Sequence, residues 1–180
     1  MAGTVEVREP ADRDEYRAGL STISAAWRAG FDDIVSEEVL SWMDGMPDRA
    51  VAEGSYDRYT DNDAVLVLVA VVDDGVIGTG SLVRNPAMTK PFVSHVDDEI
   101  RTLYVDPNWW GDGVGTRLLA GLCDGVRSEA EQLVLETLRD NERGRRFYEA
   151  RGFEHVDDAE FTIAGETYPT VVYERVLDDE

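Results

Sequence analysis

Three glycines at alternate positions stand between a predicted strand and a predicted helix. They are Gly111, Gly113 and Gly115 in the stretch WWGDGVGTRLL, and the helix is expected to begin near Val114. The first turn of a helix has unpaired N–H groups and a partial positive charge, and glycine lets the backbone approach an anion closely. We therefore expect the main-chain amides of residues 111–116 to bind a phosphate or diphosphate group.

The glycine spacing excludes two familiar phosphate-binding motifs. It differs from the dinucleotide fingerprint Gly-x-Gly-x-x-Gly, and no Lys-Ser or Lys-Thr pair follows to make a P-loop. On the glycines alone, a flexible turn without a ligand remains the alternative. Metal chemistry is not expected either, because His95, His155 and Cys123 are the only residues of their types and form no metal-ligand spacing.

Acidic residues outnumber basic ones by more than two to one. The 180 residues include 38 Asp and Glu against 17 Lys and Arg, which gives a formal net charge of −21, and Lys90 is the only lysine. A surface this acidic repels polyanions, and we therefore expect no nucleic-acid partner. Concentrated salt screens such repulsion, and we therefore expect a halophilic source. Selection for solubility or for a cationic partner is the alternative.

The length and the apolar segments predict a single domain, 1–180, in the cytoplasm. The longest apolar run, 64–72, is far shorter than the roughly 20 residues that a membrane-spanning helix needs. The N-terminal MAGTVEVREP has neither a basic leader nor an apolar export segment. We expect no membrane association.

The spacing of apolar residues predicts the order β-α-α-β-β-β-α-β-α-β-β, which is typical of one mixed α/β sheet with helices on both faces. Ser36 and Asn141 are expected to cap helices, and Asp73–Gly75 to form a hairpin turn. The expected strands are 5–9, 64–72, 76–84, 99–105, 132–138, 153–156 and 167–176, and the expected helices are 11–31, 37–43, 114–130 and 142–150.

Two stretches, EIRTLYVDPNWWGDGVGTRLL and LVLETLRDNERGRRFYEARGFE, together resemble the acetyl-CoA-binding core of the GNAT superfamily of N-acetyltransferases. The first is similar to the family's strand, its Arg/Gln-x-x-Gly-x-Gly/Ala signature and the following helix. The second is similar to the next strand, an Asn-capped helix and a Tyr-x-x-x-Gly-Phe ending. The resemblance implies a GNAT-like fold with a central, mixed, mostly antiparallel sheet of about seven strands. The sequence departs at Trp110, where the family usually has Arg or Gln.

The resemblance also implies acetyl-CoA as co-substrate. Its pantetheine arm would pair with Leu103, Tyr104 and Val105, where the fourth and fifth strands of the sheet separate. Its diphosphate would meet the glycine turn and Asn141. The turn residues assigned to the cofactor are Trp110, Gly111, Asp112, Gly113, Val114, Gly115 and Thr116. We add Arg146 from the basic stretch RDNERGRR, which also holds Arg139, Arg143 and Arg145, because guanidinium groups suit phosphate oxygens.

Acyl transfer to an amine needs two proton transfers, because the ammonium must lose a proton and the leaving thiolate gains one. Tyr148 is the expected acid. For the base, Glu99 lies where several GNAT members have a catalytic glutamate. Glu136 is the second candidate, because a carboxylate in the apolar strand LVLETL needs a partner or a task, and other members place their glutamate there. A water chain, or no dedicated base, is the third alternative.

These residues predict an N-acetyltransferase that moves an acetyl group from acetyl-CoA to a primary amine of a small molecule or peptide by direct attack. The alternative is a non-catalytic acyl-CoA-binding regulatory domain, which Trp110 would suit. The acidic stretch HVDDE, beside the predicted active strand, favours a cationic acceptor. Among oligomeric states, we consider a homodimer.

Overall fold

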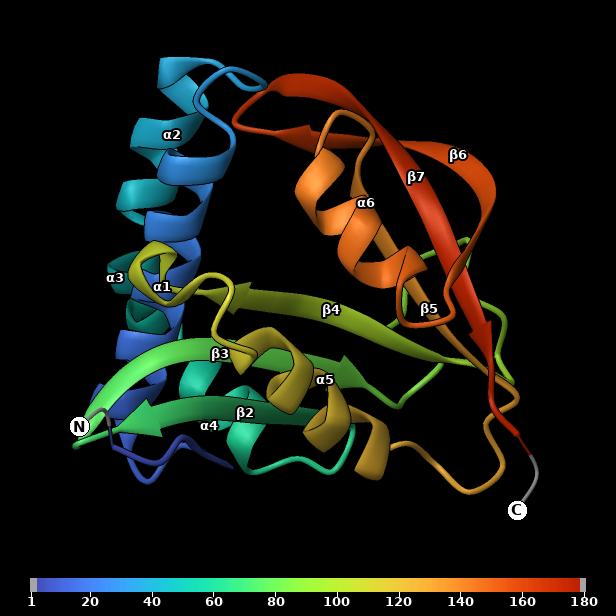
Figure 1. Ribbon diagram of the computed structural model, residues 1–180, viewed down its shortest axis with the longest axis horizontal. Helices are drawn as coiled ribbons and strands as arrows, with labels where there is room; N and C mark the ends of the chain where they lie inside the picture. The colour runs from blue at the N-terminus through green and yellow to red at the C-terminus, as the bar shows by residue number, and fades with distance from the viewer. Residues whose placement is uncertain (1–2, 179–180) are drawn as a thin grey trace.

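The computed structural model describes residues 3–178, which build one seven-stranded sheet in the order β1-β2-β3-β4-β5-β7-β6, with helices on both faces (Figure 1). The strands are β1 (Glu6–Arg8), β2 (Val65–Val72), β3 (Gly75–Val83), β4 (Asp98–Val105), β5 (Gln132–Leu138), β6 (Glu154–Ile163) and β7 (Glu166–Val176). The helices are α1 (Arg13–Gly30), α2 (Glu37–Asp44), α3 (Met46–Ala52), α4 (Ser55–Thr60), α5 (Val114–Asp124) and α6 (Glu142–Glu149), with a 3-10 turn at Pro107–Trp109.

The sheet consists of two antiparallel parts that touch along one short parallel seam. Strands β1 to β4 form the first part, and β5, β7 and β6 form the second. At the seam, β4 pairs with β5 only through Asp98 with Leu133 and Glu99 with Val134. Beyond these pairs the two strands diverge, as Figure 1 shows. The divergence opens the middle of the sheet and leaves the facing edges of β4 and β5 without a strand partner there.

Strand β4 also contains an irregularity next to the opening. Leu82 of β3 pairs with Ile100, whereas the preceding Ser81 pairs with Thr102, so Arg101 is the extra residue of a β-bulge. The bulge shifts the alternation of side chains along β4. After it, Thr102 and Tyr104 face the same side of the sheet as the first helices.

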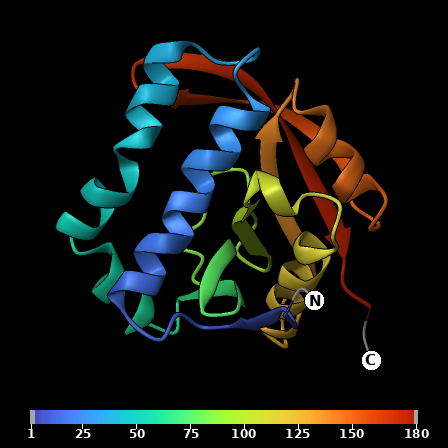
Figure 2. The same cartoon turned by 60° about the vertical axis from the view of Figure 1, so that its left-hand side comes forward.

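Two apolar cores lie on opposite faces of the sheet. Helices α5 and α6 cover one face, where Leu118 and Leu122 are fully buried. Helices α1 and α2 cover the other face through residues that include Ile23 and Trp27. Figure 2 brings α1 forward and shows it lying across the strands, with α2 to α4 beside it.

Most of the predicted elements are confirmed, including both caps. Ser36 Oγ accepts from the amide of Val39, and Asn141 Oδ1 accepts from the amide of Gly144 at 3.0 Å. The two residues of the β2–β3 turn, Asp73 and Asp74, have φ values of 48° and 64°, which suits a tight hairpin.

Two elements were missed, one was predicted too short and one too long. The helix expected over 114–130 ends at Asp124, because Gly125 follows as its C-cap. The prediction had no helix at α3 or α4, because both are short and have no continuous apolar stripe. Strand β6 extends to Ile163 rather than ending at 156. It is the outer strand of the sheet and mostly exposed, so its run of acidic side chains does not show the alternation that identifies a half-buried strand.

Candidate active site

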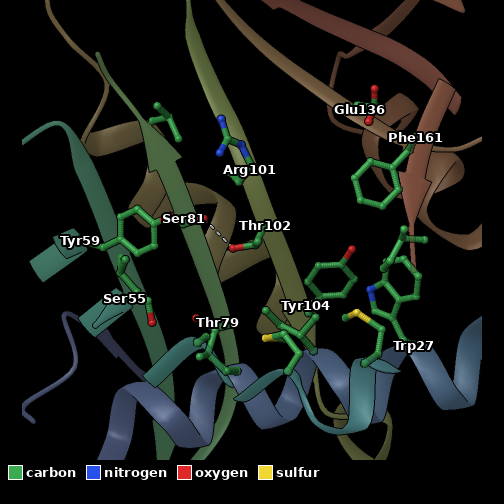
Figure 3. A pocket seen from close by; sticks show the side chains of 18 of the residues that line it. Trp27, Ser55, Tyr59, Thr79, Ser81, Arg101, Thr102, Tyr104, Glu136 and Phe161 are labelled. Atoms are coloured by element: carbon green, nitrogen blue, oxygen red, sulfur yellow. Dashed lines mark hydrogen bonds between the residues drawn. The ribbon is translucent and has the colours of Figure 1, made fainter. Parts of the chain in front are cut away.

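The opening between β4 and β5 joins two cavities. A cavity of about 180 Å³ lies toward α5 and α6, and a larger one of about 740 Å³ lies toward α1 to α4. The side chains that line both come mainly from the two diverging strands: Phe31, Arg101, Thr102, Tyr104, Glu136 and Thr137. Figure 3 shows the larger cavity, and two of the residues labelled there, Tyr104 and Glu136, also line the smaller one. Two ligands could therefore meet within the sheet.

The glycine turn lies at the mouth of the smaller cavity. Gly111 and Gly113 adopt left-handed conformations, with φ values of 86° and 80°. A Cβ on Gly115 would approach the ring of Phe147 to 3.2 Å, so this position favours glycine for packing instead. No acidic residue lies in the first turn of α5 and no side chain caps it. Backbone groups alone therefore shape the turn. No acidic side chain in the first turn of α5 offsets the partial positive charge of the helix N-terminus.

The main-chain amides of this turn are free to bind an anion. Within residues 3–178, the amides at 111 and 113–116 have no hydrogen-bond partner, and the amide of Asp112 makes only a long bond of 3.4 Å to the carbonyl of Trp109. The side chain of Thr116 accepts a hydrogen bond from Arg151. Unsatisfied donors at a helix start are a ready site for phosphate.

Trp110 is held in place by its own indole group. Its Nε1–H donates to the carbonyl of Val105 at 2.9 Å, so the side chain makes no free polar contact. Its ring instead carries the guanidinium of Arg143, which lies 4.1 Å from the ring centroid. Arg143 lines the smaller cavity, and it is the one arginine of the described chain without a hydrogen bond or ion pair there.

The structure favours Arg143 over Arg146 as the basic residue at this cavity. Both arginines are exposed, but Arg146 pairs with Glu142 at 3.2 Å and does not line the cavity. Asn141 does line it, but its amide is used within the protein: Oδ1 caps α6, and Nδ2 donates to Thr137 Oγ1 at 3.0 Å. Asn141 therefore fixes α6 against β5.

The edge of β4 that faces the smaller cavity comprises Leu103, Tyr104 and Val105. All three pair with β3 on their other side, and none pairs with β5. Their outward backbone groups can therefore accept an extended ligand as an added strand, apart from the Val105 carbonyl that Trp110 occupies.

Tyr148 projects into the smaller cavity from α6 and is surrounded by aromatic rings. Its ring packs edge-on against Phe147 and Phe153, with centroid distances of 5.3 and 5.5 Å. Burial raises the pKa of the Tyr148 phenol well above its ordinary range. The hydroxyl has no hydrogen-bond partner among the described residues, so it can donate to a ligand.

The two candidate bases occupy different environments. Glu99 is 2% exposed, lines neither of the two cavities, and is bound by Arg101 at 2.7 and 2.8 Å and by the amide of Lys90 at 3.0 Å. Glu136 lines both cavities at the point where they meet, and its carboxylate pairs with Lys90 Nζ at 3.0 Å. Of the two, Glu136 is the one placed to contact a reacting group.

The acidic stretch HVDDE does not form the acceptor surface that we expected. Asp97, Asp98 and Glu99 are all buried, and none lines the larger cavity. Asp98 is paired with Arg127 and Glu99 with Arg101. Two of these carboxylates are used within the protein and the third, Asp97, is buried away from the cavity, so the stretch gives no support to a cationic acceptor.

The sequence is matched by the family model described as acetyltransferase (GNAT) family, over residues 27–153. The chain belongs to the GNAT family of acetyltransferases. The matched segment runs from α1 to the residue before β6 and so includes the glycine turn, both diverging strands and α6.

Curated relatives of this GNAT protein match over shorter stretches. It is 34% identical over 102 residues to an uncharacterized protein of Mycobacterium leprae, covering 57% of this chain and 26% of the relative. It is also 34% identical over 80 residues to a glucosamine 6-phosphate N-acetyltransferase of Trypanosoma brucei brucei, covering 43% of this chain and 50% of the relative. The chain thus spans half or less of each relative.

Solved structures support the GNAT fold over nearly the whole chain. The PaiA N-acetyltransferase of Thermoplasma acidophilum, in complex with coenzyme A, matches with a TM-score of 0.75 and 20% identity, covering 97% of this chain and 99% of that one. A GCN5-related N-acetyltransferase from Rhodopseudomonas palustris matches with a TM-score of 0.70 and 21% identity, covering 98% and 97%.

Several residues of this GNAT site were not assigned from sequence. Lys90 and Arg101 line the larger cavity, and Arg143 lines the smaller one. Arg101 is a charged residue within the predicted strand EIRTLYV, just as Glu136 is within LVLETL, and this pattern could have identified Arg101 from the sequence. Lys90 lies in the long loop before β4, where only the tertiary structure shows its contact with Glu136.

Proposed function

We propose that this protein is an N-acetyltransferase that moves an acetyl group from acetyl-CoA to a primary amine. The observation that carries the proposal is the meeting of two cavities between β4 and β5, one of which begins at a turn of free main-chain amides. A binding module for acyl-CoA alone would need only the smaller cavity.

The residues of the smaller cavity fit coenzyme A. The free amides at 111 and 113–116 and the unpaired guanidinium of Arg143 suit a diphosphate, and the open edge of Leu103–Val105 suits the amides of the pantetheine arm. Bound acetyl-CoA supplies an acetyl thioester, whose carbon–sulfur bond is exchanged for a carbon–nitrogen bond with release of the thiol and of one proton from the ammonium.

The protein would contribute positioning and two proton transfers. Glu136 would bind the ammonium of the acceptor at the boundary of the two cavities and take its proton, directly or through water. Tyr148, whose pKa is raised by burial, keeps its proton at neutral pH and would donate it to the leaving sulfur. Positioning both ligands within one opening would supply the largest share of the rate, because effective molarities reach about 10⁵–10⁸ M.

Two measurements on the same protein test this proposal. Equilibrium dialysis measures the affinity for acetyl-CoA, and an assay of thiol release with a panel of primary amines measures transfer. We expect binding together with amine-dependent thiol release. Binding without release for every amine would favour the acyl-CoA-binding regulator instead. Absence of binding would contradict both.

The charge distribution supports a further proposal about the cellular setting. Asp97, Asp98 and Glu99 are buried and the side chain of Glu136 is 6% exposed, whereas most of the other acidic residues within 3–178 are exposed and give the surface its negative charge. We propose that the protein works in a salt-rich cytoplasm, where this repulsion is screened. No helix in the described range is long and apolar enough to cross a membrane.

A further inference from the structure

The larger cavity has a charge balance opposite to that of the whole chain. The protein has 38 acidic and 17 basic residues, yet this cavity is lined by three cations, Arg58, Lys90 and Arg101, and by two acids, Glu53 and Glu136. Its remaining lining is mostly apolar or aromatic. Polyamines need several acidic partners, so the cavity suits them poorly.

One end of this cavity holds a charged pair beside aromatic rings. Lys90 Nζ lies 3.0 Å from Glu136 Oε1 and 5.1 Å from the ring centroid of Phe161. Arg101 also lines this cavity, and Figure 3 shows it on β4, with Glu136 and Phe161 to its right and Tyr104 lower in the view. A cation and an anion are thus presented together at the boundary with the smaller cavity.

Donors remain available on both cations. Lys90 Nζ has three N–H groups, one of which is used by Glu136. Arg101 uses Nε and Nη2 for Glu99 and the carbonyl of Met88, and its Nη1 has no partner within residues 3–178. A ligand carboxylate could therefore bind here without displacing an existing contact.

Aromatic side chains line the part of the cavity next to this pair. Figure 3 shows Trp27, Tyr104 and Phe161 around the same space, and the rings of Trp27 and Phe31 pack edge to face with centroids 5.0 Å apart. These rings form a wall that suits an apolar or aromatic side chain of a ligand.

We propose that the acceptor is an α-amino acid with a large apolar or aromatic side chain. This inference rests on the proposed acetyl transfer. The α-ammonium would bind Glu136 and the α-carboxylate would bind Lys90 and Arg101, because an α-amino acid carries its two opposite charges on groups attached to the same carbon and so complements the adjacent charges of the Lys90–Glu136 pair. The apolar side chain would lie among Trp27, Tyr104 and Phe161. The α-nitrogen gains the acetyl group, the carbon–sulfur bond breaks, the thiol leaves protonated and one proton goes to solvent.

Matched pairs of acceptors test this assignment. Thiol release is measured with the twenty L-amino acids, with phenethylamine and tryptamine as carboxylate-free partners of phenylalanine and tryptophan, and with spermidine and glucosamine 6-phosphate. We expect a large apolar amino acid to be the best acceptor, with kcat/KM about 100-fold or more above its carboxylate-free partner. A better rate with the carboxylate-free amines, spermidine or the aminosugar would overturn this inference while leaving acetyl transfer supported. Binding of acetyl-CoA with no release by any acceptor would overturn both.

Variants of Lys90 separate recognition of the carboxylate from catalysis. In Lys90→Gln we expect the ratio of kcat/KM for phenylalanine over phenethylamine to fall about tenfold or more, whereas Lys90→Arg should keep most of it. Any effect of the variant on Glu136 changes both acceptors alike and cancels in the ratio. An unchanged ratio in Lys90→Gln, with the fold verified by thermal unfolding, would overturn the assignment.

Discussion

The guanidinium of Arg143 lies 4.1 Å from the ring centroid of Trp110, so a residue of the glycine turn and a residue of α6 together build one cationic surface in the smaller cavity. Trp110 occupies the position where the GNAT signature usually has Arg or Gln. Its ring contributes no charge, but it supports a charge that comes from α6. Cation–aromatic stacking orients the guanidinium while leaving its N–H groups free.

Arg143→Gln should therefore weaken the binding of acetyl-CoA. We expect the Kd to rise about tenfold, because a charged contact to phosphate is worth roughly 1.5–3 kcal/mol and Arg143 is exposed, so solvent screening reduces its contribution. Isothermal titration calorimetry gives the Kd directly. Arg146→Gln removes an equal charge one turn along α6 and is the control, with an expected change of less than twofold. Equal losses in the two variants would argue for a general charge effect.

Substitutions in the glycine turn should affect both the stability of the protein and its affinity for acetyl-CoA, whereas a glycine of the same conformation elsewhere should affect stability alone. Gly113 has a φ of 80° and Gly54 has a φ of 79°, and a Cβ on either would meet no atom within 4 Å. Both Gly113→Ala and Gly54→Ala should lose about 1 kcal/mol of unfolding free energy, since alanine tolerates this conformation poorly. Only Gly113→Ala should also weaken acetyl-CoA, because its Cβ stands at the anion site. Chemical denaturation and calorimetry on both variants check this prediction. Equal affinities of the two variants for acetyl-CoA would contradict the assignment of the glycine turn as the diphosphate site.

Tyr148→Phe should slow turnover while acetyl-CoA still binds. The phenol would supply the proton for the leaving thiol, and a general acid contributes roughly 10²–10⁴ in rate. The expected result is a fall in kcat within that range, with the Kd for acetyl-CoA nearly unchanged. Unaltered kcat would remove Tyr148 from the mechanism.

The raised pKa of Tyr148 also predicts an alkaline loss of stability. Above its ordinary value of 10.0, the phenol ionises in the unfolded chain but stays protonated in the folded one, so the unfolding free energy falls as pH rises. At pH 10.5 this group alone accounts for about 0.8 kcal/mol relative to neutral pH. Urea denaturation at both pH values should show a smaller loss in Tyr148→Phe than in the unmodified protein. Equal losses would mean that the group is not buried as described.

Removing the charge of Glu99 should mainly lower stability, whereas removing the charge of Glu136 should mainly lower the rate of turnover. Glu99→Gln leaves Arg101 without its ionic partner and should cost about 1–3 kcal/mol of unfolding free energy. Glu136→Gln should mainly lower kcat, by roughly 10²-fold or more, with a smaller effect on stability. Thermal unfolding and thiol-release kinetics on both variants separate these roles. A larger kcat loss in Glu99→Gln would reverse the assignment.

The parts of the site that lie close together in sequence could be predicted from it. The glycine turn and the Asn141 cap follow from local spacing, because a helix start is defined within a few residues. Tyr148 was assigned through the resemblance of its Tyr-x-x-x-Gly-Phe segment to the family, which is also a local signal. Lys90, Arg101 and Arg143 could not be placed in that way. Lys90 meets Glu136 across 46 residues of sequence, and Arg143 meets Trp110 only because α6 packs beside the glycine turn. Helices α3 and α4 form walls of the larger cavity, yet their short sequences have too little periodicity to reveal them.

Salt should increase the affinity of this acidic protein for an anionic co-substrate. At a formal charge of −21 the surface repels coenzyme A at long range, and the Debye length falls to roughly 3 Å at 1 M salt. Screening removes this repulsion more effectively than it removes short-range contacts to the turn amides and Arg143. We therefore expect the Kd for acetyl-CoA to fall as KCl rises from 0.1 M toward molar levels, in protein whose fold is followed by circular dichroism. The ratio of Kd values between Arg143→Gln and the unmodified protein should shrink over the same range, because that contact is ionic and partly screened. A Kd that rises with salt would mean that local attraction outweighs the charge of the whole molecule.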